Sequence, residues 1–332
     1  MPEPLLYLKA TAAAAVVSVL VMLAAAPLCH RNRWFSQLIV VALATGLAAG
    51  YVVLSLPVGW PPANALARWL TIVLPLVLLI ELFDRSGSGE SRQNWIPWTL
   101  RVVVALALPR ILLHGSVYLS GPENGWTVSQ TAAVMLSCGT SLLVVWGLLV
   151  RLAKRVAPTS VVVMLVLTIL ATGITIMLAG YLGGGAAALP LAACLIACSL
   201  TQRMLLRRNV TGPAETDSVV DNPPMIDHLP ATDRPTTVNV WFTAGGRAMV
   251  TLAVVGLFGL LFVGHFFGRL SVHNAVVLGV TPLLGWVTEL PGLRNRSPWT
   301  KAVLRIVLVT VPLAVLLGLA KQKFDRELAP LM

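Results

Sequence analysis

The strongest constraint on this chain of 332 residues is a series of apolar runs, each about 20 residues long and almost free of charged side chains. As an α-helix, a run of this length crosses the roughly 30 Å hydrocarbon core of a bilayer. We expect ten spans, at residues 10–28, 36–56, 64–83, 97–117, 128–150, 158–181, 185–206, 247–268, 273–290 and 301–320. Because the runs are continuously apolar, unlike the alternating strands of a barrel, the sequence predicts an all-α, polytopic transmembrane helical bundle of about ten spans.

Composition supports a membrane protein. With 57% apolar and only 11% charged residues, the chain carries more apolar side chains than a soluble core can bury. A net charge of +11 suggests nucleic acid in a soluble protein, but here the basic residues lie in the linkers between spans. We therefore expect the lipid bilayer, and no nucleic acid, as the main partner.

The distribution of basic residues also predicts an orientation. Most of the 24 lysines and arginines fall on one side of the membrane, the side that holds the linker after the first span. The positive-inside rule makes this side cytoplasmic. Both termini are then outside, although the basic tail at Lys321, Lys323 and Arg326 argues against this for one end. We expect an integral protein of the bacterial inner (plasma) membrane.

The chain divides into four regions. Residues 1–152 hold spans one to five, 153–206 hold spans six and seven, and 247–332 hold spans eight to ten with a short tail. The stretch 207–246 contains many prolines and acids and few apolar residues, so we expect a flexible cytoplasmic loop.

Two hairpins of spans have similar sequences. Residues 75–109 and 282–312 both begin with Pro-Leu, reach Glu-Leu, pass a basic linker and Pro-Trp-Thr, and continue through Leu-Arg to a proline. This pattern suggests a parallel internal repeat, with spans one to four matching spans seven to ten around a central hairpin. The alternative is convergent chemistry at helix ends, because Pro, Trp and Arg are all favoured near the membrane interface.

The same hairpins suggest ion pairs. Glu81 and Glu289 are placed at the cytoplasmic ends of their helices, where they can pair with Arg101 and Arg305 across each hairpin. We interpret these residues as structural anchors.

A cluster of basic residues is the first candidate binding site. Two pairs of residues are spaced by four on predicted helices: Arg110 with His114, and His265 with Arg269. Arg68 and His273 complete the cluster. An anionic small molecule or lipid headgroup suits such a cluster. The alternative is that each arginine extends outward to the interface.

Two polar stripes are the second candidate. Their residues share one helix face each and are Gln130, Ser137 and Ser141 in the fifth span, and Thr168, Thr172 and Thr175 in the sixth. They are candidates to line a polar path, but small hydroxylated residues also pack membrane helices together, which we favour. Prolines at 75, 109, 282 and 312 are candidate kinks or breaks.

No span carries a carboxylate near its middle, and no catalytic, cofactor or metal-ligand motif is present in the sequence. We therefore expect no enzyme, no cofactor and no metal. The leading hypothesis is a transporter or permease-like protein for a small, anionic solute or lipid headgroup. The alternative is a non-catalytic scaffold or assembly subunit with membrane-protein partners.

Overall fold

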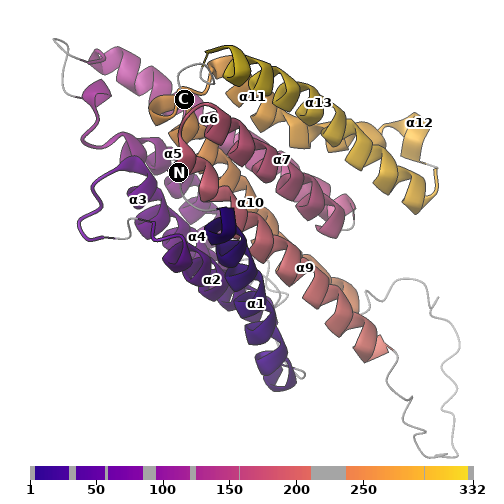
Figure 1. Cartoon of the computed structure of the whole chain (residues 1–332). Coiled ribbons are helices and arrows are strands. Elements are labelled where there is room, and N and C mark those ends of the chain that lie inside the picture. Colours follow the sequence, from indigo (N-terminus) through magenta and orange to yellow (C-terminus); the bar gives the residue numbers. More distant parts are fainter. Residues whose placement is uncertain are drawn as a thin grey trace, which may run out of the picture.

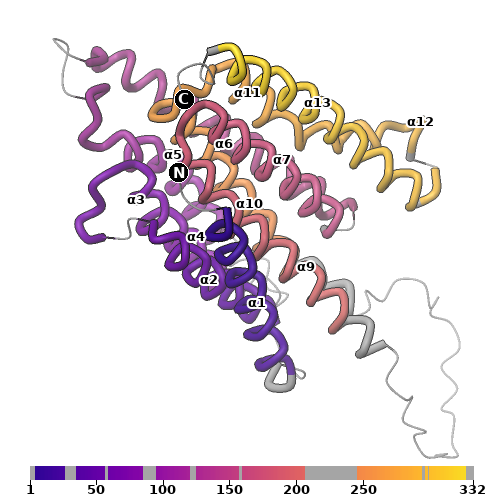
Figure 2. The backbone as a smooth tube through the Cα atoms, viewed as in Figure 1, coloured from indigo at the N-terminus to yellow at the C-terminus, as the bar shows by residue number. Residues whose placement is uncertain are grey.

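A computed structural model describes residues 4–29, 35–56, 59–84, 95–119, 125–156, 158–210, 237–294 and 296–327 (Figures 1 and 2). Every secondary-structure element in these residues is helical. The long helices are α1 (Pro4–Cys29), α2 (Phe35–Val53), α5 (Trp95–Leu113), α6 (Val128–Arg155), α7 (Pro158–Leu178), α9 (Ala188–Val210), α10 (Thr237–Phe267) and α13 (Pro298–Glu327). The short elements are α3 (Ala65–Arg68), η1 (Trp69–Val73), α4 (Leu74–Phe83), η3 (Val117–Leu119), α8 (Leu182–Ala186), α11 (Val272–Val280), η4 (Thr281–Glu289) and α12 (Pro291–Arg294).

Nine helices of the described residues are long and apolar enough to cross a membrane, with α3, η1 and α4 together forming one of them. The predicted all-α transmembrane bundle is therefore confirmed, and the chain is a membrane-spanning helical protein. The predicted ninth span, 273–290, is wrong as a continuous α-helix, because it is α11 followed by the 3-10 helix η4. A 3-10 helix rises about 2.0 Å per residue against 1.5 Å, so the two pieces still extend roughly 31 Å.

Helix α10 lies at the centre of the bundle. It contacts α2, α4, α6, α7, α9 and α11, and Figure 1 shows it running through the middle of the molecule. Of the 18 most apolar residues of its span, 78% are buried inside the protein, against 22% of the corresponding residues in α1, α6 and α13. The poorly buried helices therefore form the periphery that meets lipid.

Two of the four prolines change the helix type around them. Pro75 lacks the N–H that would pair with the carbonyl one turn earlier, and the turn before it, Trp69–Val73, widens to a π-helix. Pro282 lies at the start of the 3-10 helix η4. Pro109 and Pro312 lie inside continuous α-helices, so neither breaks its helix, and a kink at these two stays a prediction.

The two ends of the predicted loop, 207–246, are helical. Helix α9 continues to Val210 and α10 begins at Thr237. Residues 211–236 lie outside the described residues. The internal repeat stays a prediction: in the described residues the first hairpin holds α4 and α5, and the second holds η4, α12 and α13.

Candidate functional site

Helices α4, α5 and α10 are joined by a largely buried charge cluster, which we call the first ion-pair cluster: Glu81, Asp84, Arg101 and Arg247. The Arg101 guanidinium lies 2.7 Å from Glu81 Oε1 and 2.6 Å from Asp84 Oδ2, and all three side chains are at most 5% exposed. Arg247 approaches the same Asp84 oxygen at 3.7 Å. The predicted pairing of Glu81 with Arg101 is confirmed, whereas the roles of Asp84 and Arg247 were not predicted.

Aromatic and hydroxyl groups from α6 and α10 complete this cluster. Arg101 lies 6.0 Å from the centroid of the Trp146 ring, whose Nε1 donates to Thr251 Oγ1 at 3.2 Å. Because every charge has a partner, the cluster acts as a clamp between four helices.

The second ion-pair cluster, Glu289 and Arg305, joins η4 to α13. Arg305 Nη2 lies 2.8 Å from Glu289 Oε1, and its Nε donates to Thr288 Oγ1 at 2.7 Å. Its Nη1 reaches Ser160 Oγ on α7 at 3.4 Å. This confirms the second predicted pair. Its carboxylate, with a side chain that is 15% exposed, is less buried than the two carboxylates of the first cluster.

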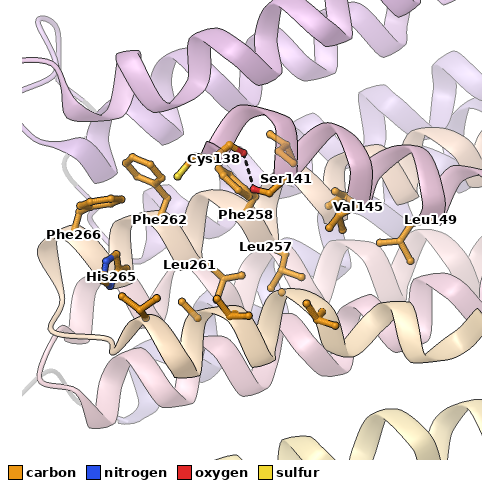
Figure 3. Close-up of a pocket in the computed structure, with 17 residues that line it drawn as sticks. Cys138, Ser141, Val145, Leu149, Leu257, Phe258, Leu261, Phe262, His265 and Phe266 are labelled. Carbon is orange, nitrogen blue, oxygen red and sulfur yellow. Dashed lines mark hydrogen bonds between the residues drawn. The ribbon is translucent and has the colours of Figure 1, made fainter. Parts of the chain in front are cut away.

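Away from the ion-pair clusters, α6, α10 and α11 enclose a cavity of about 260 Å³, which we call the lateral groove. Its floor on α10 extends from Val254 to Phe266, roughly 18 Å at 1.5 Å per residue. Its walls are Cys138 to Leu149 on α6 and Val272 to Val280 on α11. Figure 3 shows Phe258, Phe262 and Phe266 in succession along it, with His265 beside Phe266 at one end.

Two polar groups of the lateral groove, Ser141 Oγ and His265 Nδ1, are already bonded to backbone carbonyls. Ser141 Oγ donates to Cys138 O at 2.8 Å, and His265 Nδ1 lies 2.8 Å from Leu270 O, to which it donates as the N–H tautomer. The groove therefore presents an almost wholly apolar surface.

Aromatic side chains pack beside the His265 end of the lateral groove. Tyr118 and Trp126 pack on Phe266 with ring centroids 5.6 and 5.7 Å apart, and the Tyr118 hydroxyl donates to Phe266 O at 3.2 Å. Tyr and Trp favour the membrane interface. This end of the groove therefore lies near the bilayer surface.

The predicted basic residues separate into groups at this end of the molecule. Arg68 donates a hydrogen bond to the backbone oxygen of His114. His265 lies on the wall of the lateral groove, and Arg269 is exposed four residues further, in the connection to α11, with φ of 57°. Arg110 is exposed in the last turn of α5, and within the described residues no hydrogen bond or ion pair joins it to the other four. Ligand binding by these residues stays a prediction.

The two predicted polar stripes have different surroundings. On α6, Gln130, Ser137 and Ser141 are exposed, and only Ser141 lines the lateral groove. Gln130 belongs to the capping box of that helix. On α7, the three threonines are buried. Thr168 and Thr175 donate to backbone carbonyls one turn earlier, whereas Thr172 Oγ1 has no partner in the described structure.

Replacing Thr172 by valine distinguishes packing from a polar path. If α7 only packs, Thr172→Val removes an unsatisfied hydroxyl and leaves the thermal midpoint unchanged or raised. Thr168→Val, the matched control, loses the 2.9 Å bond to Met164 O and costs about 0.5–1.5 kcal/mol. A lower midpoint for Thr172→Val than for Thr168→Val, measured in detergent, contradicts simple packing and favours water beside Thr172.

The residues that sequence reasoning missed are the aromatics of α10. Phe258, Phe262 and Phe266 recur every four residues and thus share a helix face, but such a stripe is equally typical of a buried core. The identity of the facing helices, α6 and α11, is what makes this face a groove.

Comparisons with protein-family models, with curated proteins and with solved structures find no match to this chain.

Proposed function

We propose that this membrane-spanning protein is a transporter or permease-like protein, without enzymatic activity, that moves a small anionic molecule or a lipid with an anionic headgroup. The observation that carries the proposal is the interrupted span formed by α11 and η4. Interrupted helices are typical of transporters, because their freed backbone groups and variable geometry serve binding and movement. This span also forms one wall of the lateral groove.

A nine-residue 3-10 helix is unusually long, since such helices rarely exceed about four residues. If these residues wound into an α-helix, the segment would shorten by roughly 4.5 Å and its end would rotate by about half a turn. A change of this size is comparable to the one-turn shifts seen in switching proteins. Segment η4 is therefore the candidate moving part.

The contacts of η4 fit a part that is held but releasable. Arg305 links it to α13, and the Arg155 guanidinium lies 5.3 Å from the centroid of the Trp286 ring. Gly285 allows close packing, because a Cβ there would lie 2.8 Å from Met164 Cε. Since Glu289 is partly exposed, breaking its pair with Arg305 costs less than breaking the first ion-pair cluster.

The test measures flux through the protein in reconstituted vesicles. The probes are trapped inorganic phosphate, released to the outside, and a fluorescent phosphatidylglycerol, reduced by external dithionite. We expect the protein to accelerate one of the two over protein-free vesicles. Glu289→Gln is expected to raise that rate at least threefold, because η4 loses its ion pair.

The matched control is Asp325→Asn, which removes an exposed carboxylate elsewhere on α13 and should leave the rate unchanged. If neither probe moves faster than in protein-free vesicles, the transport proposal is wrong. Equal rates for wild type, Glu289→Gln and Asp325→Asn would remove η4 from the mechanism.

The alternative function is a non-catalytic scaffold or assembly subunit. It is favoured by an exposed apolar stripe on α13, formed by Val303, Val307, Val311, Val315 and Leu319, each at least 42% exposed. Such a stripe suits either lipid or a membrane-protein partner. Crosslinking in native membranes decides: a stable heteromeric product together with absent flux favours the scaffold, and recovery of monomer alone counts against it.

A further inference from the structure

We infer that the lateral groove binds one acyl chain of an anionic membrane phospholipid, whose headgroup lies at the Arg269 end. The inference rests on the proposed function in one respect: it identifies this phospholipid as the transported molecule. Its first support is length: the groove extends roughly 18 Å along α10, and one leaflet of hydrocarbon is about half of 30 Å thick. A single chain of one leaflet fits this dimension.

The chemistry of the walls also favours a hydrocarbon chain. Apart from Cys138, Ser141 and His265, the lining residues are apolar, and Ser141 Oγ and His265 Nδ1 are bonded to Cys138 O and Leu270 O. A volume of about 260 Å³ lies just below the range of about 300–1,000 Å³ usual for drug-sized ligands. The groove is therefore suited to one chain rather than to a whole lipid.

Charge at the end of the groove favours an anionic headgroup. Arg269 is exposed three residues before Val272, which lines the groove, and the described structure gives it no ion-pair partner. His273 is exposed in the first turn of α11, whose N-terminus adds a partial positive charge. A phosphate with its chain in the groove lies within this positive region near the bilayer surface.

Gly279 provides a way to fill the groove without disturbing the fold. It lines the groove on α11, and a Cβ there would lie 3.5 Å from Leu261 Cδ1, an ordinary contact. Gly279→Leu therefore places a side chain where the acyl chain would lie. Its control is Gly318→Leu on α13, where a Cβ meets nothing within 4 Å.

Arg269→Asn removes the headgroup charge while keeping a residue that tolerates the left-handed conformation at φ of 57°. Its control is Arg326→Gln, which removes another exposed arginine, from the last turn of α13. Gly279→Leu therefore tests the site of the acyl chain, and Arg269→Asn tests the site of the headgroup.

The experiment is native mass spectrometry of the purified full chain with phosphatidylglycerol and phosphatidylcholine of equal acyl length. We expect wild type to retain one phospholipid and to prefer phosphatidylglycerol. Gly279→Leu should reduce retained lipid at least fivefold, and Arg269→Asn should reduce the preference about fivefold. Both controls should match wild type, and a phosphatidylglycerol with a mid-chain diazirine should label α6, α10 and α11.

Other outcomes overturn the inference. Equal retention of both lipids, unaffected by Gly279→Leu, identifies ordinary surrounding lipid. Dimers that Gly279→Leu dissociates identify a second copy as the occupant. If phosphate is transported but no lipid is retained selectively, the transport proposal stands and the lipid inference is wrong. If the lipid is retained selectively but not transported, the groove binds lipid, and the proposal that the lipid is the transported molecule is wrong.

Discussion

Arg101→Ala is expected to destabilise the protein by about 3–5 kcal/mol, because it leaves Glu81 and Asp84 buried without their shared cation. Both carboxylates are at most 5% exposed, so water cannot compensate for the lost guanidinium. The Trp146 ring also loses its cation. The measurement is the thermal midpoint of the folded monomer in detergent, followed by fluorescence size-exclusion chromatography.

The control for this variant is Arg151→Ala, which removes an exposed arginine from α6 and should change stability by no more than about 0.5 kcal/mol. A combined Glu81→Gln, Asp84→Asn and Arg101→Met variant is expected to recover most of the loss, because no fully buried charge is then left unpaired. If Arg101→Ala and Arg151→Ala have the same thermal midpoint, the cluster does not hold the helices together.

Gly259→Ala is expected to destabilise the protein by about 1–3 kcal/mol or more. A Cβ at position 259 would lie 2.1 Å from Trp69 Nε1, far inside van der Waals contact. Trp69 is fully buried and belongs to the π-helical turn before Pro75, so its rigid indole has no free space to enter. The clash must therefore move either α10 or the π turn, and the thermal midpoint should fall.

Gly318→Ala is the matched control, since nothing lies within 4 Å of its added methyl and the helix gains up to about 1 kcal/mol from losing glycine. Adding Trp69→Leu to Gly259→Ala should restore part of the stability by making room. The packing of Trp69 on α10 is refuted if the two glycine variants have equal midpoints.

Helix-end chemistry was the part of the site that the sequence predicted well. Glu81 and Arg101 lie at the same end of a hairpin whatever the arrangement of the other helices, so their pairing follows from the order of spans alone. The same holds for Glu289 and Arg305. The contribution of Arg247 depends on α10 packing beside α4, a contact distant in sequence that no local pattern contains.

Helix type and neighbour identity were the parts that sequence reasoning could not supply. The run around Pro282 is uniformly apolar, so its composition permits an α-helix or a 3-10 helix equally, and packing against Met164 and Arg305 accompanies the 3-10 form. The lateral groove likewise arises because α6 and α11 flank α10 with a gap between them. Apolar lining residues carry no signal that separates a groove from a packed core.

The lateral groove lies at the edge of the bundle, so the ligand concentration that matters for it is the concentration in the membrane. Peripheral α6, with only 22% of its most apolar window buried, forms one wall, so the groove meets the bilayer before it meets water. A ligand that enters from the side is supplied by the membrane as a two-dimensional solvent, and occupancy then follows its mole fraction among lipids. If the groove takes an acyl chain as proposed, titrations are best expressed in mole percent, and we expect detergents with long alkyl chains to compete with the lipid.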